Sequence, residues 1–407
     1  MVTLRTLLET AFHTALRQLD PALLMRRHAD GLDHTRAHVL LAIGKAAPAM
    51  ARGVLSSRLQ LAQALVITTD GTAAEDLTPW VKVLRAAHPV PDQRSQNAAE
   101  HALELARAAG HAPLLVCVSG GASALVCAPA TGMSLEAKQR LTDALLRSGA
   151  DIREVNVVRR HLSRIKGGHL AAAGSSTVHT AIVSDVVDGA PHDVGSGPSC
   201  ADPTTCADAD EVLRTRLGDS YRLAFAPHLT ESVKPDAPVA SRTHVVSLCG
   251  PAQLAQQVAG NLRRLRMRAW VETSPTQRPG DFAVWLAVRA AGLRPGCACV
   301  VACEPTVQLA KRHGRGGRAG WVALAALHAL PPHTALLAGA SDGVDGDSGA
   351  GGACVEAAMA GSLAISEVQR VLHEHNDSAA HAALGSHLVG GPTGVNLTDV
   401  YVVARSR

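Results

Sequence analysis

The sequence predicts an α/β protein of two domains, with a mostly parallel sheet in the N-terminal domain and a smaller α/β domain after it. One indication is length, because 407 residues exceed what a single hydrophobic core usually supports. Another is a repeated alternation of short apolar runs with longer alanine- and leucine-rich segments of helical period, which is typical of parallel sheets. Composition agrees, since 47% apolar and 18% charged residues indicate a compact fold.

The predicted strands are short apolar runs. In chain order they are Val39–Ile43, Ala64–Thr68, Leu114–Val118, Thr180–Val183, Thr243–Leu248, Cys297–Cys303 and Ala335–Ala338. A last apolar run, Asp399–Val403, is predicted to be an edge strand. The best linker candidate is Ser232–Ser241, which contains two prolines and few large apolar groups. We therefore expect domains of residues 1–238 and 239–407, with the boundary near Pro238 to within about a dozen residues.

Composition also excludes several classes of protein. Aromatic residues make up only 2% and the net charge is +4, so we expect no nucleic-acid partner. The N-terminal segment has leucines along one helical face and carries Glu9, which predicts an amphipathic helix rather than a signal peptide. No apolar run has the length of a membrane span. Cysteines scattered through apolar strands indicate reduced thiols, so we expect a cytoplasmic protein, monomeric or homodimeric.

The most informative segment is Ala338–Ala353, where Asp342, Asp345 and Asp347 alternate with glycines. Glycine accepts positive φ and leaves backbone amides uncovered, which suits a loop that approaches a charged ligand. The segment follows a predicted strand, and ligands of open α/β sheets bind at the carboxyl ends of strands. The aspartates are therefore candidate metal ligands, acting through water.

A second glycine-rich turn, Ser119-Gly120-Gly121-Ala122-Ser123, also follows a predicted strand and precedes a helix-like segment. Exposed amides at such a helix start bind anions. Lys45 lies in a similar strand-to-helix turn, where it could reach a carboxylate or a phosphate. It is not a Walker A lysine, because Val39 and Ala46 occupy the positions that the P-loop reserves for glycine and Ser or Thr. The alternative is a solvated surface lysine.

A cationic segment carries Arg159, Arg160, Arg164 and Lys166 and ends in paired glycines. Helical spacing places Arg160 and Arg164 on one face, and the arrangement indicates an anion site; the alternative is a solvated charged face. Asp185 follows the next predicted strand, where it could bind a metal or accept a proton from a hydroxyl. Alternatively, Asp185 only caps a turn.

A third glycine-rich segment, 314–320, precedes a predicted helix. With Gly316 and Gly317 flanked by Arg315 and Arg318, it suits a phosphate-binding helix start. The segment is a poor match to a dinucleotide-binding loop, because such loops are followed, about twenty residues later, by an acidic residue at the end of the next strand, and none stands there. A serine-protease reading of Gly346–Gly349 fails for lack of an all-β context.

Taken together, the motifs resemble the glycerate 2-kinases whose C-terminal part is called the multi-organism fragment rich in leucine. The resemblance covers nearly the whole chain, in order. It is carried by IGKAAPAM (43–50), HPVPD (88–92), SGGASAL (119–125), NVVRRHLSRIKGGHLA (156–171), SDVVDG…GSGP (184–198), SDGVDGDSGAGGA (341–353) and GPTGVNLTDVY (391–401).

The resemblance implies a Rossmann-like N-terminal domain, a cleft between the domains, and transfer of the ATP γ-phosphate to the 2-hydroxyl of D-glycerate with a divalent metal, Mg²⁺. It implies that Lys45 contacts substrate or the transferring phosphate, that Arg160 and Lys166 add positive charge, and that Asp185 binds metal or orients the hydroxyl. The Ser119–Ser123 turn, including Gly120 and Gly121, would hold an anionic group. Phosphoryl transfer requires mainly positioning and charge neutralisation, which these groups could supply.

The chain departs from the family pattern at several positions. Ala122 replaces a third glycine, Ala302–Thr306 replaces a glycine-glycine-glutamate motif, and Arg318-Ala319-Gly320 stands where asparagine-glutamine-glutamate is usual. The aspartate-glycine order after Asp185 is also shifted. Two rival functions follow: a hydroxypyruvate reductase, a label that members often bear, and a repurposed member with another acceptor or no turnover.

Overall fold

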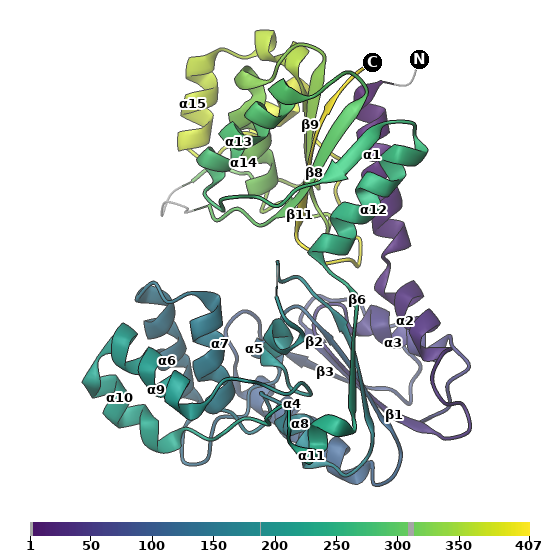
Figure 1. Cartoon of the computed structure of the whole chain (residues 1–407), viewed down its shortest axis with the longest axis vertical. Helices are drawn as coiled ribbons and strands as arrows, with labels where there is room; N and C mark the ends of the chain where they lie inside the picture. The colour runs from purple at the N-terminus through teal and green to yellow at the C-terminus, as the bar shows by residue number, and fades with distance from the viewer. Residues whose placement is uncertain (1–2, 188, 308–312) are drawn as a thin grey trace. The chain divides into compact units, whose positions relative to one another are not determined.

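The computed structural model describes residues 3–187, 189–307 and 313–407, and these group into two compact units (Figure 1). One unit is Pro21–Leu248; the other combines Cys249–Arg407 with the described part of Met1–Asp20. The chain passes between units after Leu248, which lies within about a dozen residues of the expected boundary near Pro238. The first helix, α1 (Leu4–Gln18), groups with the C-terminal residues, whereas the expected bounds, 1–238 and 239–407, placed it in the N-terminal domain.

The unit Pro21–Leu248 is built on a six-stranded sheet in the order β3-β2-β1-β4-β5-β6. Its strands are β1 (His38–Ile43), β2 (Leu61–Thr69), β3 (Lys82–Ala86), β4 (Leu114–Ser119), β5 (Val178–Val183) and β6 (Thr243–Cys249). The pairs β1/β2, β2/β3, β1/β4 and β4/β5 are parallel, as expected for this domain. The chain runs outward from β1 to one edge and then from β4 to the other, so the order reverses between β1 and β4.

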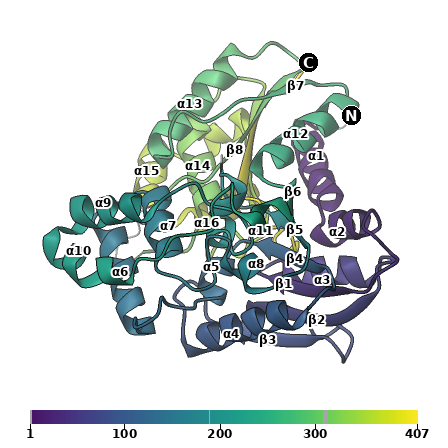
Figure 2. The ribbon, with the colours of Figure 1, turned by 60° about the horizontal axis from the view of Figure 1, so that its bottom comes forward.

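Helices cover this sheet, and every residue of β1 and β4 is buried. The helix α4 packs along β3 (Figure 2), and its alanines join the main apolar core. A second apolar cluster joins α6, α7 and α9. The helices of the unit are α2 (Pro21–Ala29), α3 (Ala47–Leu55), α4 (Gln93–Ala108), α5 (Ala122–Leu125), α6 (Leu135–Arg147), α7 (Ile152–His161), α8 (His169–Ala173), α9 (Cys206–Leu217), α10 (Asp219–Phe225) and α11 (Pro238–Ser241), with 3₁₀ turns at η1 (Pro191–Ser196) and η2 (Ala226–His228).

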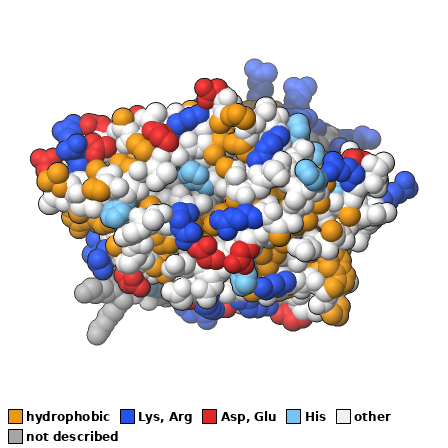
Figure 3. Space-filling model, turned by 90° about the horizontal axis from the view of Figure 1, so that it is seen from below, with side chains coloured by type: hydrophobic (Ala, Val, Ile, Leu, Met, Phe, Trp, Pro, Cys, Tyr) orange, Lys and Arg blue, Asp and Glu red, His pale blue; other side chains and the backbone are white. Residues whose placement is uncertain are grey.

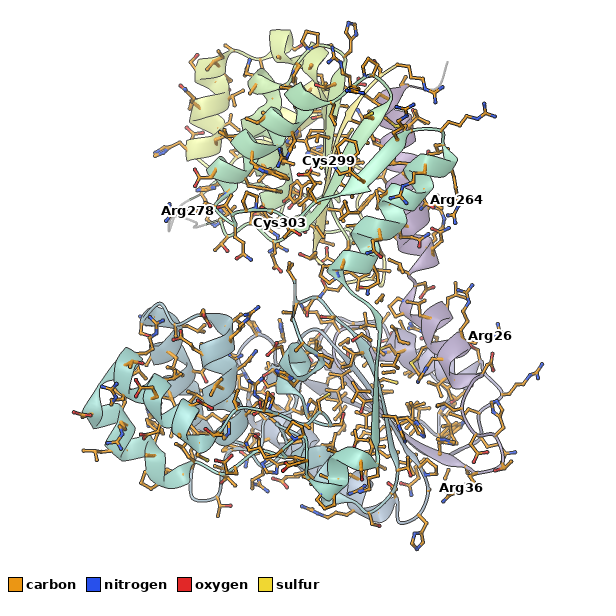
Figure 4. The ribbon with its side chains drawn as sticks, viewed as in Figure 1. Arg26, Arg36, Arg264, Arg278, Cys299 and Cys303 are labelled. Atoms are coloured by element: carbon orange, nitrogen blue, oxygen red, sulfur yellow. The ribbon has the colours of Figure 1, made fainter. Side chains whose placement is uncertain are left out.

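The other unit contains a five-stranded mixed sheet in the order β10-β9-β11-β8-β7. Its strands are β7 (Arg268–Val271), β8 (Cys297–Cys303), β9 (Thr334–Ala340), β10 (Gly352–Glu356) and β11 (Asp399–Arg405). Its helices are α1, α12 (Pro251–Arg264), α13 (Pro279–Gly292), α14 (Arg318–Ala326), α15 (Ile365–His373) and α16 (Asp377–Leu384), with η3 (Leu327–Ala329) and η4 (Ala357–Ser362). Figure 4 shows Cys299 and Cys303 along β8 and Arg278 at the start of α13.

The prediction of an edge strand at Asp399–Val403 was wrong. β11 pairs antiparallel with both β8 and β9 and lies in the middle of the sheet. The physical reason is visible in the side chains: residues 399–404 are all buried, and the Tyr401 ring meets the Phe282 ring edge-on at 4.8 Å between centroids. A run without polar alternation is typical of a strand that is covered on both faces.

Three further features concern membrane spans, surface charge and cysteines. In the described parts of the chain, no helix combines the length and apolar character that crossing a membrane requires. On the face shown in Figure 3, basic and acidic side chains lie interspersed rather than gathered into a field of one sign. All the cysteines are free, and all except Cys206 are buried.

Candidate functional site

Two loops meet where the strand order reverses, at the carboxyl ends of β1 and β4. The Lys45 amide donates to the Gly120 carbonyl at 2.9 Å, and the Ala46 amide donates to Ser119 Oγ at 3.0 Å. Gly44 makes this approach possible: its φ is +130°, and a Cβ there would lie 2.1 Å from Ser119 Oγ. Because the reversal point of an open α/β sheet is its usual ligand site, these loops form the first candidate site.

Three functional side chains surround the glycines of this turn. A Cβ on Gly120 would lie 2.1 Å from Asp185 Oδ2, so the carboxylate rests against the glycine backbone. A Cβ on Gly121 would lie 3.2 Å from His88 Cδ2 and 3.4 Å from Lys45 Cγ. Burial and the nearby Lys45 charge lower the pKa of His88. The structure thus brings together the predicted Lys45 and Asp185, which come from β1 and β5.

His88 was missed as a site residue, although its motif HPVPD was noticed. It follows β3, so its backbone reaches the same end of the sheet as Lys45. A single histidine before a proline gives no chemical signal of its own. The position of His88 in the fold could have identified it, since His88 follows the carboxyl end of a strand in the same sheet.

A cavity of about 680 Å³ adjoins the turn. Of the predicted residues, Gly121, Ser123 and Lys166 line it. The wall also contains cationic and titratable groups that were not selected as site residues from the sequence, among them His88, Lys138 and Arg159. The cavity therefore extends the candidate site from the turn to helices α6 and α7.

Two lysines of the cavity are buried and held by backbone carbonyls. Lys166 Nζ donates to Ser123 O at 2.7 Å and to Val126 O at 3.0 Å. Lys138 Nζ donates to Leu162 O and, at 3.5 Å, to Arg159 O. Burial lowers the pKa of Lys166 to about 7 and that of Lys138 to about 8. Desolvation disfavours the charged ammonium, and carbonyls compensate for it only partly.

The predicted Arg160 and Arg164 lie elsewhere, in ion pairs, and neither lines the cavity. Arg160, 2% exposed, lies between Asp193 (Nη1 to Oδ1, 3.2 Å) and Asp202 (Nε to Oδ2, 3.1 Å). Arg164 pairs with Glu100 and donates from Nε to Pro129 O at 3.0 Å. Their charges are thus neutralised within the protein. The pattern of the cationic segment could not show this, because the partner carboxylates are distant in the sequence.

The other unit gathers three buried carboxyl groups around the start of α14. Asp345 accepts the amides of Ala319 at 3.0 Å and Gly320 at 2.8 Å, so it caps the helix. Asp377 accepts the Gly317 amide at 3.2 Å. Asp399 Oδ2 lies 2.6 Å from Arg318 Nε. Burial raises the pKa of Asp345, and it raises that of Asp377 to about 7.

The predicted phosphate cradle at Gly316, Gly317 and Arg318 is occupied by protein groups. Gly316 donates to Asp347 Oδ1 at 2.7 Å, while Gly317 donates to Asp377. A Cβ on Gly316 would lie 1.9 Å from Asp377 Oδ1, so this glycine serves close packing of a carboxyl group. A phosphate could take these amides only by displacing the carboxylates.

Two departures from the family pattern contact each other here. Arg318 Nη1 lies 2.7 Å from Glu304 Oε1, which joins the segment 302–306 to the start of α14. The third departure, Ala122, is buried. A Cβ on Gly195 would lie 2.9 Å from the Ala122 methyl group, so the glycine at position 195 leaves room for that methyl group. A cavity of about 670 Å³ lies beside these segments, lined by Thr276, Gln277, Arg278, Pro279, Thr306, Val307, Trp321 and His375.

The predicted metal ligands belong to different units, Asp185 to one and Asp342 and Asp345 to the other. Asp342 is exposed and accepts the Val344 amide at 3.1 Å. Within the described ranges, ligand atoms within 4.8 Å of one another occur instead at His161, Cys206 and Glu231. In that cluster Lys234 Nζ already lies 2.6 Å from Glu231, so a cation is in place without a metal.

The six-stranded sheet with its strand-order reversal and the second, mixed sheet define a two-unit α/β protein whose glycine-rich turn lies at the reversal point. A family profile described as a domain of unknown function, DUF4147, matches residues 7–228, and the MOFRL family profile matches residues 297–399. A glycerate 2-kinase of Pyrococcus horikoshii is 32% identical over 384 residues, which are 89% of this chain and 86% of that protein. The chain belongs to this glycerate 2-kinase family.

Other relatives and solved structures agree. A D-glycerate 2-kinase of Thermotoga maritima is 30% identical over 89% of both chains, and a protein of Agrobacterium vitis named putative hydroxypyruvate reductase is 33% identical over 99% of this chain and 94% of its own. A crystal structure of Thermotoga maritima glycerate kinase matches with a TM-score of 0.84 at 27% identity over 99% of both chains. A Pyrococcus horikoshii structure covers 100% of both chains with a TM-score of 0.82 at 27% identity.

Proposed function

We propose that this protein is an ATP-dependent glycerate kinase, which transfers the γ-phosphate to the 2-hydroxyl of D-glycerate or of a related hydroxy acid. The observation that carries the proposal is the convergence of Lys45, His88 and Asp185 around the Ser119–Gly121 turn. This arrangement supplies a cation, a carboxylate and a glycine backbone within one small region. Phosphoryl transfer depends on positioning and charge neutralisation by groups of this kind.

In the proposed reaction the hydroxyl oxygen bonds to the γ-phosphorus while the bond from that phosphorus to the leaving ADP oxygen breaks. Asp185 orients the hydroxyl and accepts its proton, because its carboxylate lies against the turn that receives the substrate. Lys45 neutralises charge on the transferring group or the substrate. The turn from Ser119 to Ser123 holds an anionic group through its backbone.

Mg²⁺ is part of the proposal, and the donor chemistry fits it. Mg²⁺ usually takes one or two carboxylates together with substrate phosphates. Asp185 offers such an oxygen beside the turn, and the exposed Asp342 is a separate candidate within its own unit. When bound, the ion would neutralise phosphate charge. Asp345 is a weaker candidate, since both of its oxygens already accept helix amides.

The turn after β1 argues against the rival hydroxypyruvate reductase. The sheet order of the Pro21–Leu248 unit is that of many dinucleotide-binding proteins. However, the turn after β1 reads Gly44-Lys45-Ala46-Ala47-Pro48 and lacks the glycine fingerprint that approaches a pyrophosphate. The fold alone does not determine the chemistry.

The test is ADP release from ATP and Mg²⁺ with a panel of hydroxy acids led by D-glycerate, with the product identified by mass. We expect 2-phosphoglycerate. Oxidation of NADH by hydroxypyruvate, measured in parallel, should be absent. ATP binding without phosphorylation of any acceptor would contradict the proposal and support a repurposed family member.

A further inference from the structure

Four Lys or Arg side chains from the described part of the chain line the cavity beside the turn; Arg140 is exposed, whereas Lys138, Arg159 and Lys166 are buried or half-buried. Arg159 lies near Lys138 and Lys166, since its charge contributes to the lowered pKa values of both lysines. Among the described residues, none of the three forms an ion pair, whereas the neighbouring Arg160 and Arg164 do. The carboxylate that lines the same cavity, Asp143, pairs with Arg147 at 2.8 Å.

We propose that Lys138, Arg159 and Lys166 form a cradle for the carboxylate of the acceptor, and that this cradle selects small hydroxy acids over neutral polyols. This inference rests on the proposed function, because it assigns the residues that bind the carboxylate of the hydroxy acid whose hydroxyl is phosphorylated. It extends the site beyond the turn that holds the reacting groups.

Hydrogen-bond capacity supports the cradle. An ammonium group has three donors, and each lysine uses two of them on backbone carbonyls, so one donor remains on each. The guanidinium of Arg159 has five donors in a planar fork that matches a carboxylate. A carboxylate accepts about four hydrogen bonds, so these groups could saturate it.

The scaffold makes the cradle rigid. Lys138 lies on α6 and Arg159 on α7, and these helices share a buried apolar cluster that includes Leu141, Val155 and Val158. Lys138 also binds the last carbonyls of α7, where the helix dipole favours a cation. The two lysine ammonium groups are therefore held in place before a ligand arrives, which reduces the cost of binding.

The electrostatics select for an anion. Burial lowers the pKa of Lys138, of Lys166 and of Arg159, as expected for cations taken from water without a counter-ion. A ligand carboxylate would supply this counter-ion, whereas a neutral polyol would not. In an α-hydroxy acid the carboxylate is one bond from the reacting carbon. Lys166 places the cradle next to the turn, because its ammonium group binds the carbonyl of Ser123 within that turn.

The test combines binding and kinetics for Arg159→Met, with Arg153→Met as the matched control because Arg153 is exposed on the same helix. Calorimetry without ATP measures binding of D-glycerate, glycerol and inorganic phosphate. We expect Arg159→Met to weaken D-glycerate binding and raise its KM at least about tenfold, with the KM of ATP changed less than about twofold. Arg153→Met should match the wild type, and glycerol should not bind measurably.

Each outcome decides the proposal. Unchanged D-glycerate affinity in Arg159→Met would overturn it. Weakened binding of phosphate but not of D-glycerate would overturn it too, since the cradle would then serve a phosphate. If Arg159→Met does not fold, Arg159→Lys keeps the charge but loses the fork, and it should still weaken D-glycerate binding. Arg159-dependent carboxylate binding without phosphorylation would support the cradle and contradict the proposed function.

Discussion

Gly120 has room for a hydrogen atom only, because the Asp185 carboxylate fills the space that a side chain would take. We expect Gly120→Ala to displace this carboxylate and to lower kcat/KM for D-glycerate at least about tenfold, since misplaced catalytic groups cost rate steeply. Steady-state kinetics measure the effect. Gly260→Ala is the control, because a Cβ there meets nothing within 4 Å. Equal activity of the two variants would contradict the assigned place of Asp185.

Lys45 and Asp185 carry the charge that the proposed reaction needs. We expect Lys45→Ala and Asp185→Asn each to lower kcat at least about a hundredfold, as for other charge-positioning groups in phosphoryl transfer. Circular dichroism should show an unchanged fold, because Lys45 is exposed. Near-normal turnover in either variant would show that the substituted residue is not part of the active site.

Some of the site residues could be predicted from the sequence, and the reason is local. Lys45, Ser119 and Gly121 stand in strand-to-helix turns whose chemistry can be read from neighbouring residues. Whether an arginine is free depends instead on partners far along the chain. Arg159 and Arg160 are adjacent, yet Asp193 and Asp202 neutralise only Arg160, so the pattern favoured the wrong neighbour for the cavity.

At the scale of elements, the start of α14 depends on Asp345. We expect Asp345→Ala to lower the free energy of unfolding by about 1–3 kcal/mol, because two buried amides lose their acceptor. Urea denaturation at neutral pH measures this change. The control is Asp342→Ala, which removes an exposed side chain of the same loop and should change stability by less than about 0.5 kcal/mol. An equal decrease in the free energy of unfolding of both variants would mean that the Asp345 cap does not stabilise α14.

Most strands could be predicted because their apolar runs are continuous, as in β1, β4 and β8. The predictions omitted β3, β7 and β10. β3 and β7 are short and in part exposed, so their composition does not separate them from loops. β10 is also short, and it follows the glycine-rich segment that was predicted to be a loop. Position in the sheet could not be read from position in the chain. β11 is the last strand in the sequence but the central strand of its sheet, and its side chains are buried on both faces.

For the whole molecule, buried lysines make stability depend on pH. Burial lowers the pKa of Lys138 from 10.5 to about 8, so between these values the unfolded chain binds a proton that the folded chain has released. The free energy of unfolding therefore rises with pH across this window. Lys138→Met lacks the contribution, so the wild type should gain stability relative to this variant between pH of about 7.5 and about 10.

Urea denaturation of the ligand-free protein at each pH measures this difference. Lys82→Met, which removes an exposed lysine, serves as the control. Its free energy of unfolding should change with pH as that of the wild type does. A constant difference between the wild type and Lys138→Met would mean that the buried ammonium keeps its ordinary titration.

The helix α1 packs against residues that follow the Pro21–Leu248 unit in the sequence. The Phe12 ring covers Gly339 of β9, and the Ala11 carbonyl accepts a hydrogen bond from Asn261 of α12 at 3.1 Å. During translation α1 is made before these partners, which emerge only after the whole of Pro21–Leu248. The nascent chain must therefore carry the apolar face of α1 uncovered while the intervening unit completes its own core. A ribosome stalled just after that unit should display a protease-resistant body and a cleavable segment that contains α1, and this segment should become protected only when residues 249–407 have emerged.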